Sequence, residues 1–132
     1  MELFDKTFRA IERSLDLRFK RHMVLSSNAA NSETPSYKAR ELDFGGELER
    51  MLGQEQQVLL RTNAHHMDLA SAQSAKVVSD NSAAVGADGN NVDIDLNMGK
   101  LSGNARAYNN AVDLLGVKLQ MLRMAARGTG GF

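Results

Sequence analysis

Histidine and aspartate side chains are the residues in this 132-residue sequence that could do chemistry. Three histidines are present, and two of them, His65 and His66, are adjacent and close to Asp68. Neighbouring side chains diverge by about 100° on a helix and point to opposite faces of a strand. Zinc needs ligands that converge on one point, so two diverging imidazoles and one carboxylate make a poor metal site. We therefore predict no metal site here.

Asp93 and Asp95 form a second candidate pair, since paired carboxylates can serve acid–base catalysis. No candidate base, nucleophile or metal ligand accompanies them, so we interpret them as helix-entry residues that favour the positive end of the helix dipole. The sequence has no glycine-rich phosphate loop, no G-x-S-x-G element and no H-E-x-x-H pair. It also has no cysteine, which excludes disulfides and thiolate chemistry. We predict neither an enzyme nor a cofactor-binding protein.

The overall charge excludes further classes. The 16 basic and 16 acidic side chains balance, whereas a general nucleic-acid binder needs a basic surplus. No apolar run approaches the ~20 residues of a membrane helix, and the charged first residues do not resemble a secretory signal. Residues 1–30 and 95–132 are mildly basic, while residues 31–94 carry ten acidic against five basic side chains.

The N-terminal segment, residues 1–31, is expected to form a long helix. Its apolar positions are spaced alternately by four and three residues, which is the heptad pattern of a coiled coil. The seam consists of Phe4, Phe8, Ile11, Leu15, Arg18, His22, Leu25 and Ala29. No glycine or proline interrupts it before about residue 30. The polar Arg18 and His22 are either a solvated gap at the edge of the seam or a contact to a neighbouring subunit.

The C-terminal segment, residues 95–132, shows the same pattern more clearly, followed by a glycine-rich tail. Asp95 or Asn97 is the expected cap of this helix. Flanking apolar residues widen the stripe, which suggests that the helix touches more than one neighbour. The predicted seam consists of Met98, Leu101, Ala105, Tyr108, Val112, Leu115, Leu119, Leu122 and Ala126.

The segment between them, residues 32–94, is predicted to be a loop-rich insert. Thr34 precedes the only proline, Pro35, and is therefore pushed toward extended geometry, so the first helix must end before it. A short helix is expected from Phe44 to Leu52, with Asp43 as its cap. Residues 58–60 and 77–78 are candidate strands, residues 79–91 read as a loop, and residues 92–96 as a brief extended approach to the last helix.

The fold class that follows is mostly α, with the two terminal helices paired as an antiparallel coiled coil. Each helix has an apolar stripe that it can bury only against another element, and about 65 residues separate the two helices. We treat residues 1–132 as a single unit. Because a helix pair is thin, we expect its helices to be weakly ordered alone and stabilised by copies or partners.

A stretch of turn-forming residues follows the first helix. Its positions Asn28, Asn31, Thr34, Pro35 and Tyr37 describe a helix that ends in asparagines, then an X-Pro turn and an anchoring tyrosine. This spacing resembles the signature of the flagellar basal-body rod and hook family. Four further segments are similar to the proximal-rod branch of that family. They are residues 38–44, Arg61-Thr62 with His65, residues 91–95, and the last helix, which contains Tyr108. Ser36 stands where the family usually has glycine, so a positive φ there would strain the chain.

The resemblance implies a structural subunit of the rod, the drive shaft of the bacterial flagellum, within the periplasm. Members are exported unfolded through the flagellar type III apparatus, and their terminal helices form an inner coiled-coil layer. The implied partners are other copies, other proximal rod proteins, and the rod adapter protein and export gate at the rod base; neither nucleic acid nor a membrane span is expected.

We expect the seam to bury Phe8, Ile11, Leu15 and Leu25 against Leu101, Tyr108, Val112, Leu115, Leu119 and Leu122. The five signature residues should hold the chain that leaves the first helix and contact a neighbouring subunit. The alternative is a cytoplasmic helical adaptor or export chaperone that binds partners through the same stripes. An enzyme would need an unrecognised site built from His65, His66 and Asp68.

Overall fold

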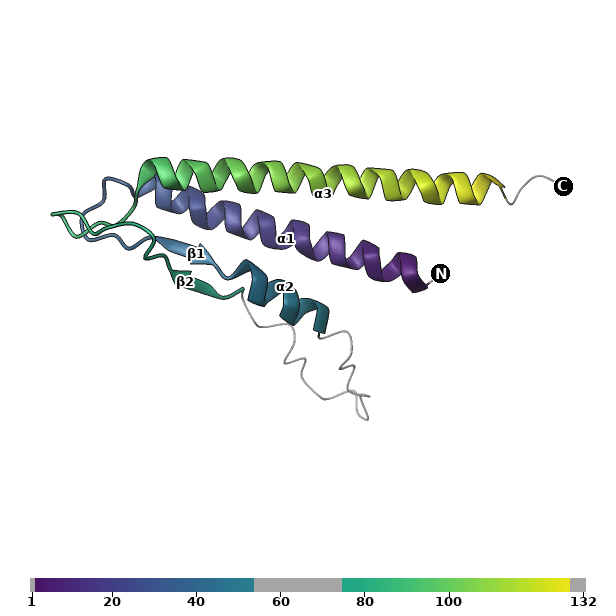
Figure 1. Ribbon diagram of the computed structural model, residues 1–132, viewed down its shortest axis with the longest axis horizontal. Coiled ribbons are helices and arrows are strands. Elements are labelled where there is room, and N and C mark those ends of the chain that lie inside the picture. Colours follow the sequence, from purple (N-terminus) through teal and green to yellow (C-terminus); the bar gives the residue numbers. More distant parts are fainter. Residues whose placement is uncertain (1, 54–74, 129–132) are drawn as a thin grey trace, which may run out of the picture.

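The computed structural model describes residues 2–53 and 75–128 (Figure 1). The elements are α1 (Glu2–Ala30), β1 (Arg40–Leu42), α2 (Phe44–Gly53), β2 (Val77–Ser79) and α3 (Ile94–Gly128). The candidate strand at residues 58–60 lies outside the described residues, as do Arg61, Thr62, His65, His66 and Asp68.

Two long antiparallel helices dominate the molecule. α1 has 29 residues and α3 has 35, and they lie against each other along most of α1 (Figure 1). This confirms the mostly α class and the pairing of the terminal helices. Within residues 2–53 and 75–128, no helix has the combination of length and apolar character that crossing a membrane requires.

Two asparagines of α3 fix how the long helices are aligned. Asn97 Nδ2 donates to the Leu25 carbonyl at 2.9 Å, and Asn104 Nδ2 donates to the Arg18 carbonyl at 2.8 Å. The two asparagines are seven residues apart, and so are the two carbonyls, so one heptad of α3 matches one heptad of α1. Sliding either helix would break both bonds, which sets a single register.

The α3 residues that contact α1 are offset by one position in the sequence from part of the predicted seam. Asn97 and Asn104 are buried, and Leu101, Ala111 and Leu115 are half-buried. The apolar residues that follow the facing positions are exposed: Met98 by 50%, Val112 by 41% and Leu119 by 41%. Tyr108 and Leu122 are also exposed. The single chain does not cover these residues, and the expected packing of Tyr108, Val112, Leu119 and Leu122 against the seam residues of the first helix stays a prediction.

The insert forms a two-stranded antiparallel sheet and a short helix that both pack on α1. β1 pairs with β2 with Glu41 opposite Val78, which confirms the candidate strand at residues 77–78. Asp43 caps α2 as predicted, because its Oδ1 accepts from Gly46 N at 3.2 Å. α2 lies against α1, where the Arg18 guanidinium carbon is 4.7 Å from the centre of the Phe44 ring.

The start of α3 corrects two expectations. Its cap is Asp93, whose Oδ1 accepts from Leu96 N at 3.0 Å, rather than Asp95 or Asn97. Asn97 is turned inward to α1 and so is not available as a cap. The helix begins at Ile94, so Ile94 and Leu96 are helical and not part of an extended approach.

The apolar core is small and lies where α1 meets the insert and α3. Its buried apolar residues among those described are Ile11, Leu17, Leu25, Ala39 and Leu42. Leu17 is 0% exposed, although it is not on the predicted seam. Helix periodicity places Leu17 beside Arg21 and Asn28, which face β1, so α1 buries a second stripe that the single heptad pattern did not reveal.

We expect Leu17→Ala to lower the free energy of unfolding by about 2–5 kcal/mol, because it leaves a cavity in a core with few other members. Thermal unfolding followed by circular dichroism in a stabilising concentration of sucrose would measure it. Leu119→Ala is the matched control, since this leucine is exposed and its loss should cost about 0.5 kcal/mol or less. Equal effects of the two changes would contradict the assigned core.

Candidate assembly site at the end of the helix pair

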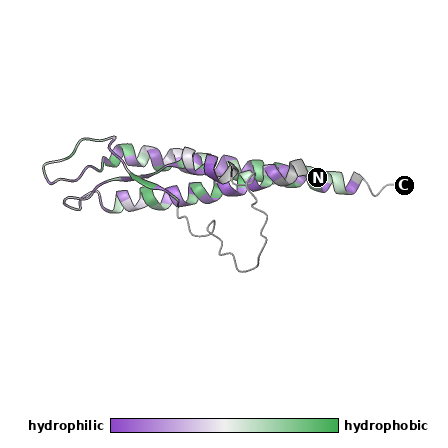
Figure 2. Cartoon of the chain, turned by 90° about the horizontal axis from the view of Figure 1, so that it is seen from below, coloured by the Kyte–Doolittle hydropathy of each residue, from purple (hydrophilic) through white to green (hydrophobic). Residues whose placement is uncertain are grey.

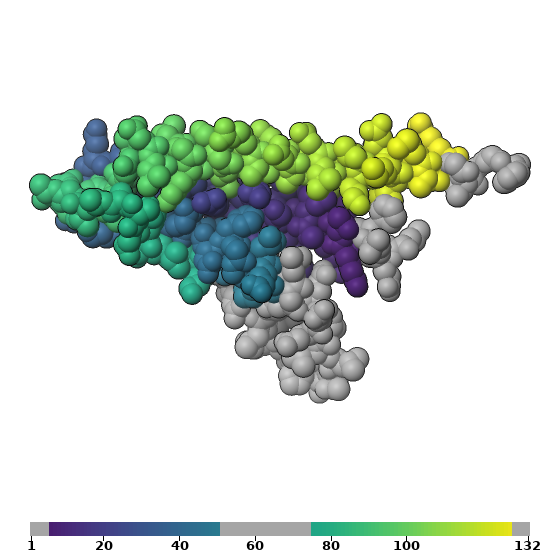
Figure 3. Space-filling model, viewed as in Figure 1, coloured from purple at the N-terminus to yellow at the C-terminus, as the bar shows by residue number. Residues whose placement is uncertain are grey.

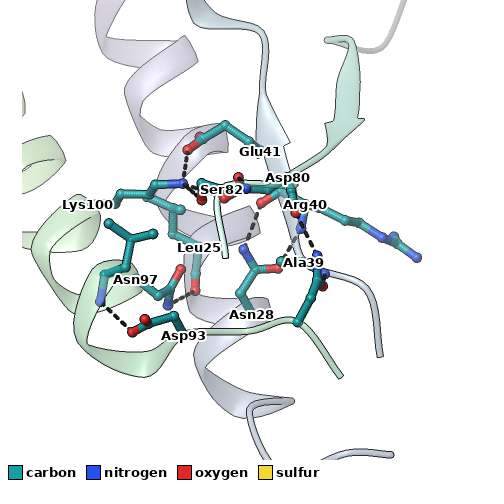
Figure 4. Close-up of polar contacts among 12 residues, drawn as sticks. Leu25, Asn28, Ala39, Arg40, Glu41, Asp80, Ser82, Asp93, Asn97 and Lys100 are labelled. Atoms are coloured by element: carbon teal, nitrogen blue, oxygen red, sulfur yellow. Dashed lines mark hydrogen bonds and ion pairs between the residues drawn. The ribbon is translucent and has the colours of Figure 1, made fainter. Parts of the chain in front are cut away.

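Asn28 joins the last turn of α1 to the start of β1. Its side chain is 1% exposed, and its Nδ2 donates to the Arg40 carbonyl at 2.7 Å while its Oδ1 accepts from Arg40 N at 3.0 Å (Figure 4). Both main-chain groups of Arg40 are thus bound by one amide, as a neighbouring strand would bind them. The Tyr37 hydroxyl also donates to Asn28 Oδ1 at 3.3 Å, which helps to orient the amide.

Asn90 and Asn91 hold the same junction from the other side. Asn91 Oδ1 accepts from Ala39 N at 2.7 Å, and its Nδ2 donates to the Asp80 carbonyl at 2.8 Å. Asn90 Nδ2 lies 2.9 Å from each of three carbonyl oxygens in the turn after α1. Both residues are buried, and the bond from Ala39 N to Asn91 is buried as well, so these amides supply partners for main-chain groups of the junction. The two chain segments that leave α1 and enter α3 are thereby tied together.

The remaining signature residues form the turn itself. Asn31 Nδ2 donates to the Ser27 carbonyl at 2.8 Å, and Thr34 Oγ1 donates to Asn31 Oδ1 at 3.1 Å. Tyr37 N donates to the Thr34 carbonyl at 3.2 Å, which closes the turn around Pro35. Thr34 and Pro35 are exposed. The structure therefore brings all five signature residues into one junction.

Ser36 has the positive φ that its place in the motif suggested. Its φ is 61°, a left-handed conformation that glycine adopts more easily than serine. Ser36 N donates to the Asp88 carbonyl at 2.9 Å, which holds this conformation in place. The facing residue, Gly89, has a φ of 81°, and a side chain there would meet Ser36 Cα at 3.4 Å. The two loops approach closely at this point.

An ion network connects α1, β1, the loop after β2 and α3. Arg21 Nε and Nη2 donate to the two carboxylate oxygens of Glu41 at 2.8 and 3.1 Å. Lys100 Nζ lies 3.5 Å from Glu41 Oε2, and it also binds Asp80 Oδ2 and, at 3.2 Å, Ser82 Oγ (Figure 4). Each charge has a partner from a different element, so the network fastens the insert to the helix pair.

Burial and hydrogen bonding act in opposite directions on the two carboxylates. Burial alone would raise the pKa of Glu41, but the hydrogen bond and charge of Arg21 outweigh it and hold the pKa below its usual range. Burial would likewise raise the pKa of Asp80, and the hydrogen bonds from Lys100 and Ser82 lower it below the usual range. Both groups therefore favour the folded state when they are ionised.

Sequence reasoning missed the asparagines outside the signature. Asn97 and Asn104 occupy heptad positions that face α1, and Asn90 and Asn91 bind the turn. A search for polar residues seven apart in the C-terminal helix would have found the first pair. Of the α1 seam, Ile11 and Leu25 are buried, Leu15 is half-buried and Phe8 is 36% exposed.

The arrangement positions the main chain and presents no array of reactive groups among the described residues. A long helix pair, a small insert and a junction held by amides are the parts of an elongated structural subunit.

Comparison with known proteins identifies the family of structural subunits to which the chain is similar. No protein-family model matches the chain. It is similar to the flagellar basal body rod protein FlgB of Salmonella typhimurium, at 30% identity over 97% of this chain and 98% of that protein. The FlgB of Aeromonas hydrophila is 32% identical over 95% and 96%, and that of Bacillus subtilis is 30% identical over 97% and 98%.

The chain belongs to the FlgB family of flagellar basal body rod proteins. It is therefore a structural subunit of the rod and not an enzyme, and it works in contact with other rod proteins. The comparisons do not support the alternative of an adaptor or export chaperone.

We expect the stability of the fold to fall with acid as the network loses charge. The lowered pKa values of Glu41 and Asp80 contribute stability above the ordinary carboxyl pKa of about 4, and this is lost as the pH falls through the lowered values. Unfolding midpoints measured from about pH 6 to pH 2 should therefore drop, and Asp80→Asn should remove part of this dependence. Asp16→Asn, at an exposed carboxylate on α1, is the control. An unchanged acid dependence in Asp80→Asn would contradict the role of the network.

Proposed function

We propose that α1 and α3 form part of an inner coiled-coil layer of the proximal rod, with residues 1–132 acting as one rod unit. The helix pair would pack against other copies of the chain and against other proximal rod proteins. The insert would lie outside this layer and brace it. The observation that carries the proposal is an apolar stripe that the single chain leaves exposed.

This stripe lies on the flank of the helix pair away from the insert. Helix periodicity places Phe8 and Phe19 opposite Leu17, Arg21 and Asn28, the side of α1 that faces β1. Hydrophobic segments recur along both long helices in Figure 2. The exposed large apolar residues of this flank are Phe8, Phe19, Met98, Tyr108, Val112 and Leu119. An apolar surface that spans two helices is typical of a protein interface.

A groove between the helices opens on the same flank. It has a volume of about 270 Å³ and is lined by α1 residues that include Phe19 and His22 and by α3 residues that include Ala105 and Tyr108. Asn104 is also in its wall, and its Oδ1 is buried without a hydrogen-bond partner in the described structure. A buried acceptor that lacks a donor is costly. A donor from a neighbouring subunit, seated in the groove, would satisfy it, and His22 would then contact that neighbour.

The small core supports folding that is completed during assembly. Few apolar residues are buried, and a chain that travels unfolded to its site of assembly should not form a very stable monomer. The chain also has no cysteine that could be cross-linked in an oxidising compartment. We propose that the subunit is exported unfolded and meets the rod adapter protein and the export gate at the rod base.

The signature residues have a matching role in this proposal. Asn28, Asn31, Thr34, Pro35 and Tyr37 hold the chain that leaves α1, and the exposed Thr34 and Pro35 would contact a neighbouring subunit. Their geometry depends on buried amides, so the contact surface is presented in a fixed shape.

Val112→Asp should block rod assembly, because it places a charge in the exposed stripe. The purified variant should keep the circular dichroism spectrum of the parent, since Val112 is 41% exposed and contributes little to the packing of the single chain. Swimming in soft agar, and the presence of the protein in isolated basal bodies, would both be lost.

Asn110→Asp is the matched control, because it adds the same charge to an exposed position on the other flank of α3. It should swim normally. A Val112→Asp strain that swims and incorporates the subunit as the parent does would overturn the proposed packing face.

A further inference from the structure

Two buried polar atoms of the groove residues have no hydrogen-bond partner in the part of the chain that the structure describes. One is Arg18 Nε, a donor on α1, and the other is Asn104 Oδ1, an acceptor on α3. Asn104 is 3% exposed, and both residues line the groove between the two helices. A buried donor or acceptor that stays unpaired costs free energy, so the two atoms indicate a partner group that the single chain lacks.

The fold holds both side chains in place. Asn104 Nδ2 donates to the Arg18 carbonyl at 2.8 Å, and exchanging the oxygen and nitrogen of this amide would place an oxygen against that carbonyl. α1 lies between α3 and α2 (Figure 3). The Arg18 guanidinium carbon is 4.7 Å from the centre of the Phe44 ring of α2, which orients the guanidinium group. The unpaired donor and acceptor are therefore positioned before any partner binds.

The size and the walls of the groove limit what can enter it. Its volume is about 270 Å³, whereas one turn of a helix about 10 Å across fills about 400 Å³. A side chain can therefore enter, while the main chain of a neighbouring helix stays outside. Phe19, Ala105 and Tyr108 make much of the wall apolar, which favours an uncharged occupant.

The two unpaired atoms require a group that accepts one hydrogen bond and donates another. A carboxylate would accept from Arg18 Nε, but it has no proton to donate to Asn104. An ammonium group would donate to Asn104, but the positive charge of Arg18 would repel it. A primary carboxamide has its acceptor and its donors on separate atoms, so it can serve both residues at once.

We propose that the groove binds the side-chain amide of an asparagine or glutamine that belongs to another rod protein. The oxygen of this amide accepts from Arg18 Nε, its NH₂ donates to Asn104 Oδ1, and its methylene groups lie against Phe19 and Tyr108. The chain works in contact with other rod proteins, and the groove opens on the flank that carries the exposed apolar stripe. A polar contact buried in an apolar interface specifies register and partner. The inference rests on the packing face proposed above and adds the side chain that this face recognises.

Arg18→Met separates recognition from folding. Methionine has a flexible apolar side chain that can still contact the Phe44 ring, but it has no donor and no charge. In the isolated chain it removes an unpaired buried donor, so the midpoint of thermal unfolding in sucrose should stay the same or rise. In cells, the amount of subunit in isolated basal bodies should fall about tenfold, because the bound amide loses its donor. Lys20→Met is the matched control, since it removes a positive charge from an exposed position of α1 and should change neither quantity.

A photoreactive benzophenone side chain at position 109 identifies the occupant. Asn109 lines the groove, while Asn110 is exposed on the other flank of α3 and is the control position. After illumination of basal bodies, mass spectrometry should find position 109, but not position 110, attached to a segment of another rod protein, within one helical turn of an asparagine or glutamine. Replacing that amide with leucine should lower incorporation about tenfold. Adding Arg18→Met should then cause little further loss, because both changes remove the same contact.

The proposal is wrong if Arg18→Met is incorporated as the parent is, or if it lowers the unfolding midpoint together with incorporation, as a purely structural arginine would. A product of position 109 with a second copy of this chain, or with a segment that lacks asparagine and glutamine, would also overturn it, as would two losses that add. Failure of the packing face is a separate result, because Val112→Asp would then swim normally. If only the amide recognition is wrong, Val112→Asp stays defective while Arg18→Met assembles.

Discussion

The fold depends on buried asparagine amides that take the place of main-chain partners. A helix end and a short two-stranded sheet leave many N–H and C=O groups without a regular partner, and each would be costly to bury unpaired. The Asn28 amide binds the main-chain N–H and C=O of Arg40, and the Asn91 amide binds the main-chain N–H of Ala39 and the C=O of Asp80. Asn97 and Asn104 bind main-chain carbonyls of α1. Because an amide both donates and accepts, one side chain can replace a peptide group. These contacts set the register of the helices and the path of the loops.

A structure held in this way has little apolar core. Among the described residues, five apolar and six polar or charged ones are buried. Hydrogen bonds that replace bonds to water contribute about 1 kcal/mol each to stability, whereas burial of a large apolar side chain contributes about 1.5–3 kcal/mol. The amides therefore specify the shape, but the few buried apolar side chains contribute too little free energy to make an isolated chain very stable. The apolar stripe on the open flank is where a rod can supply it.

Sequence patterns predicted the elements well and their contacts less well. The heptad spacing located both long helices, and the order of asparagines, threonine, proline and tyrosine located the junction. The predicted seam of α3 runs through Met98, Val112 and Leu119 because these residues are apolar, while the face toward α1 holds Asn97 and Asn104. Apolar periodicity identifies a stripe but not which neighbour covers it. Leu17 lies outside the predicted seam for a related reason, because α1 buries two stripes and a single heptad pattern describes only one.

We infer that the buried amides define the fold, while neighbouring subunits supply much of its stability. Far-UV circular dichroism of the purified chain, measured over a range of concentrations and on heating, tests it most directly. We expect partial helicity and a broad thermal transition at the lowest protein concentration, with helicity rising as the concentration of protein or sucrose increases. Full helicity and a sharp, cooperative transition in the dilute chain, independent of concentration, would contradict it.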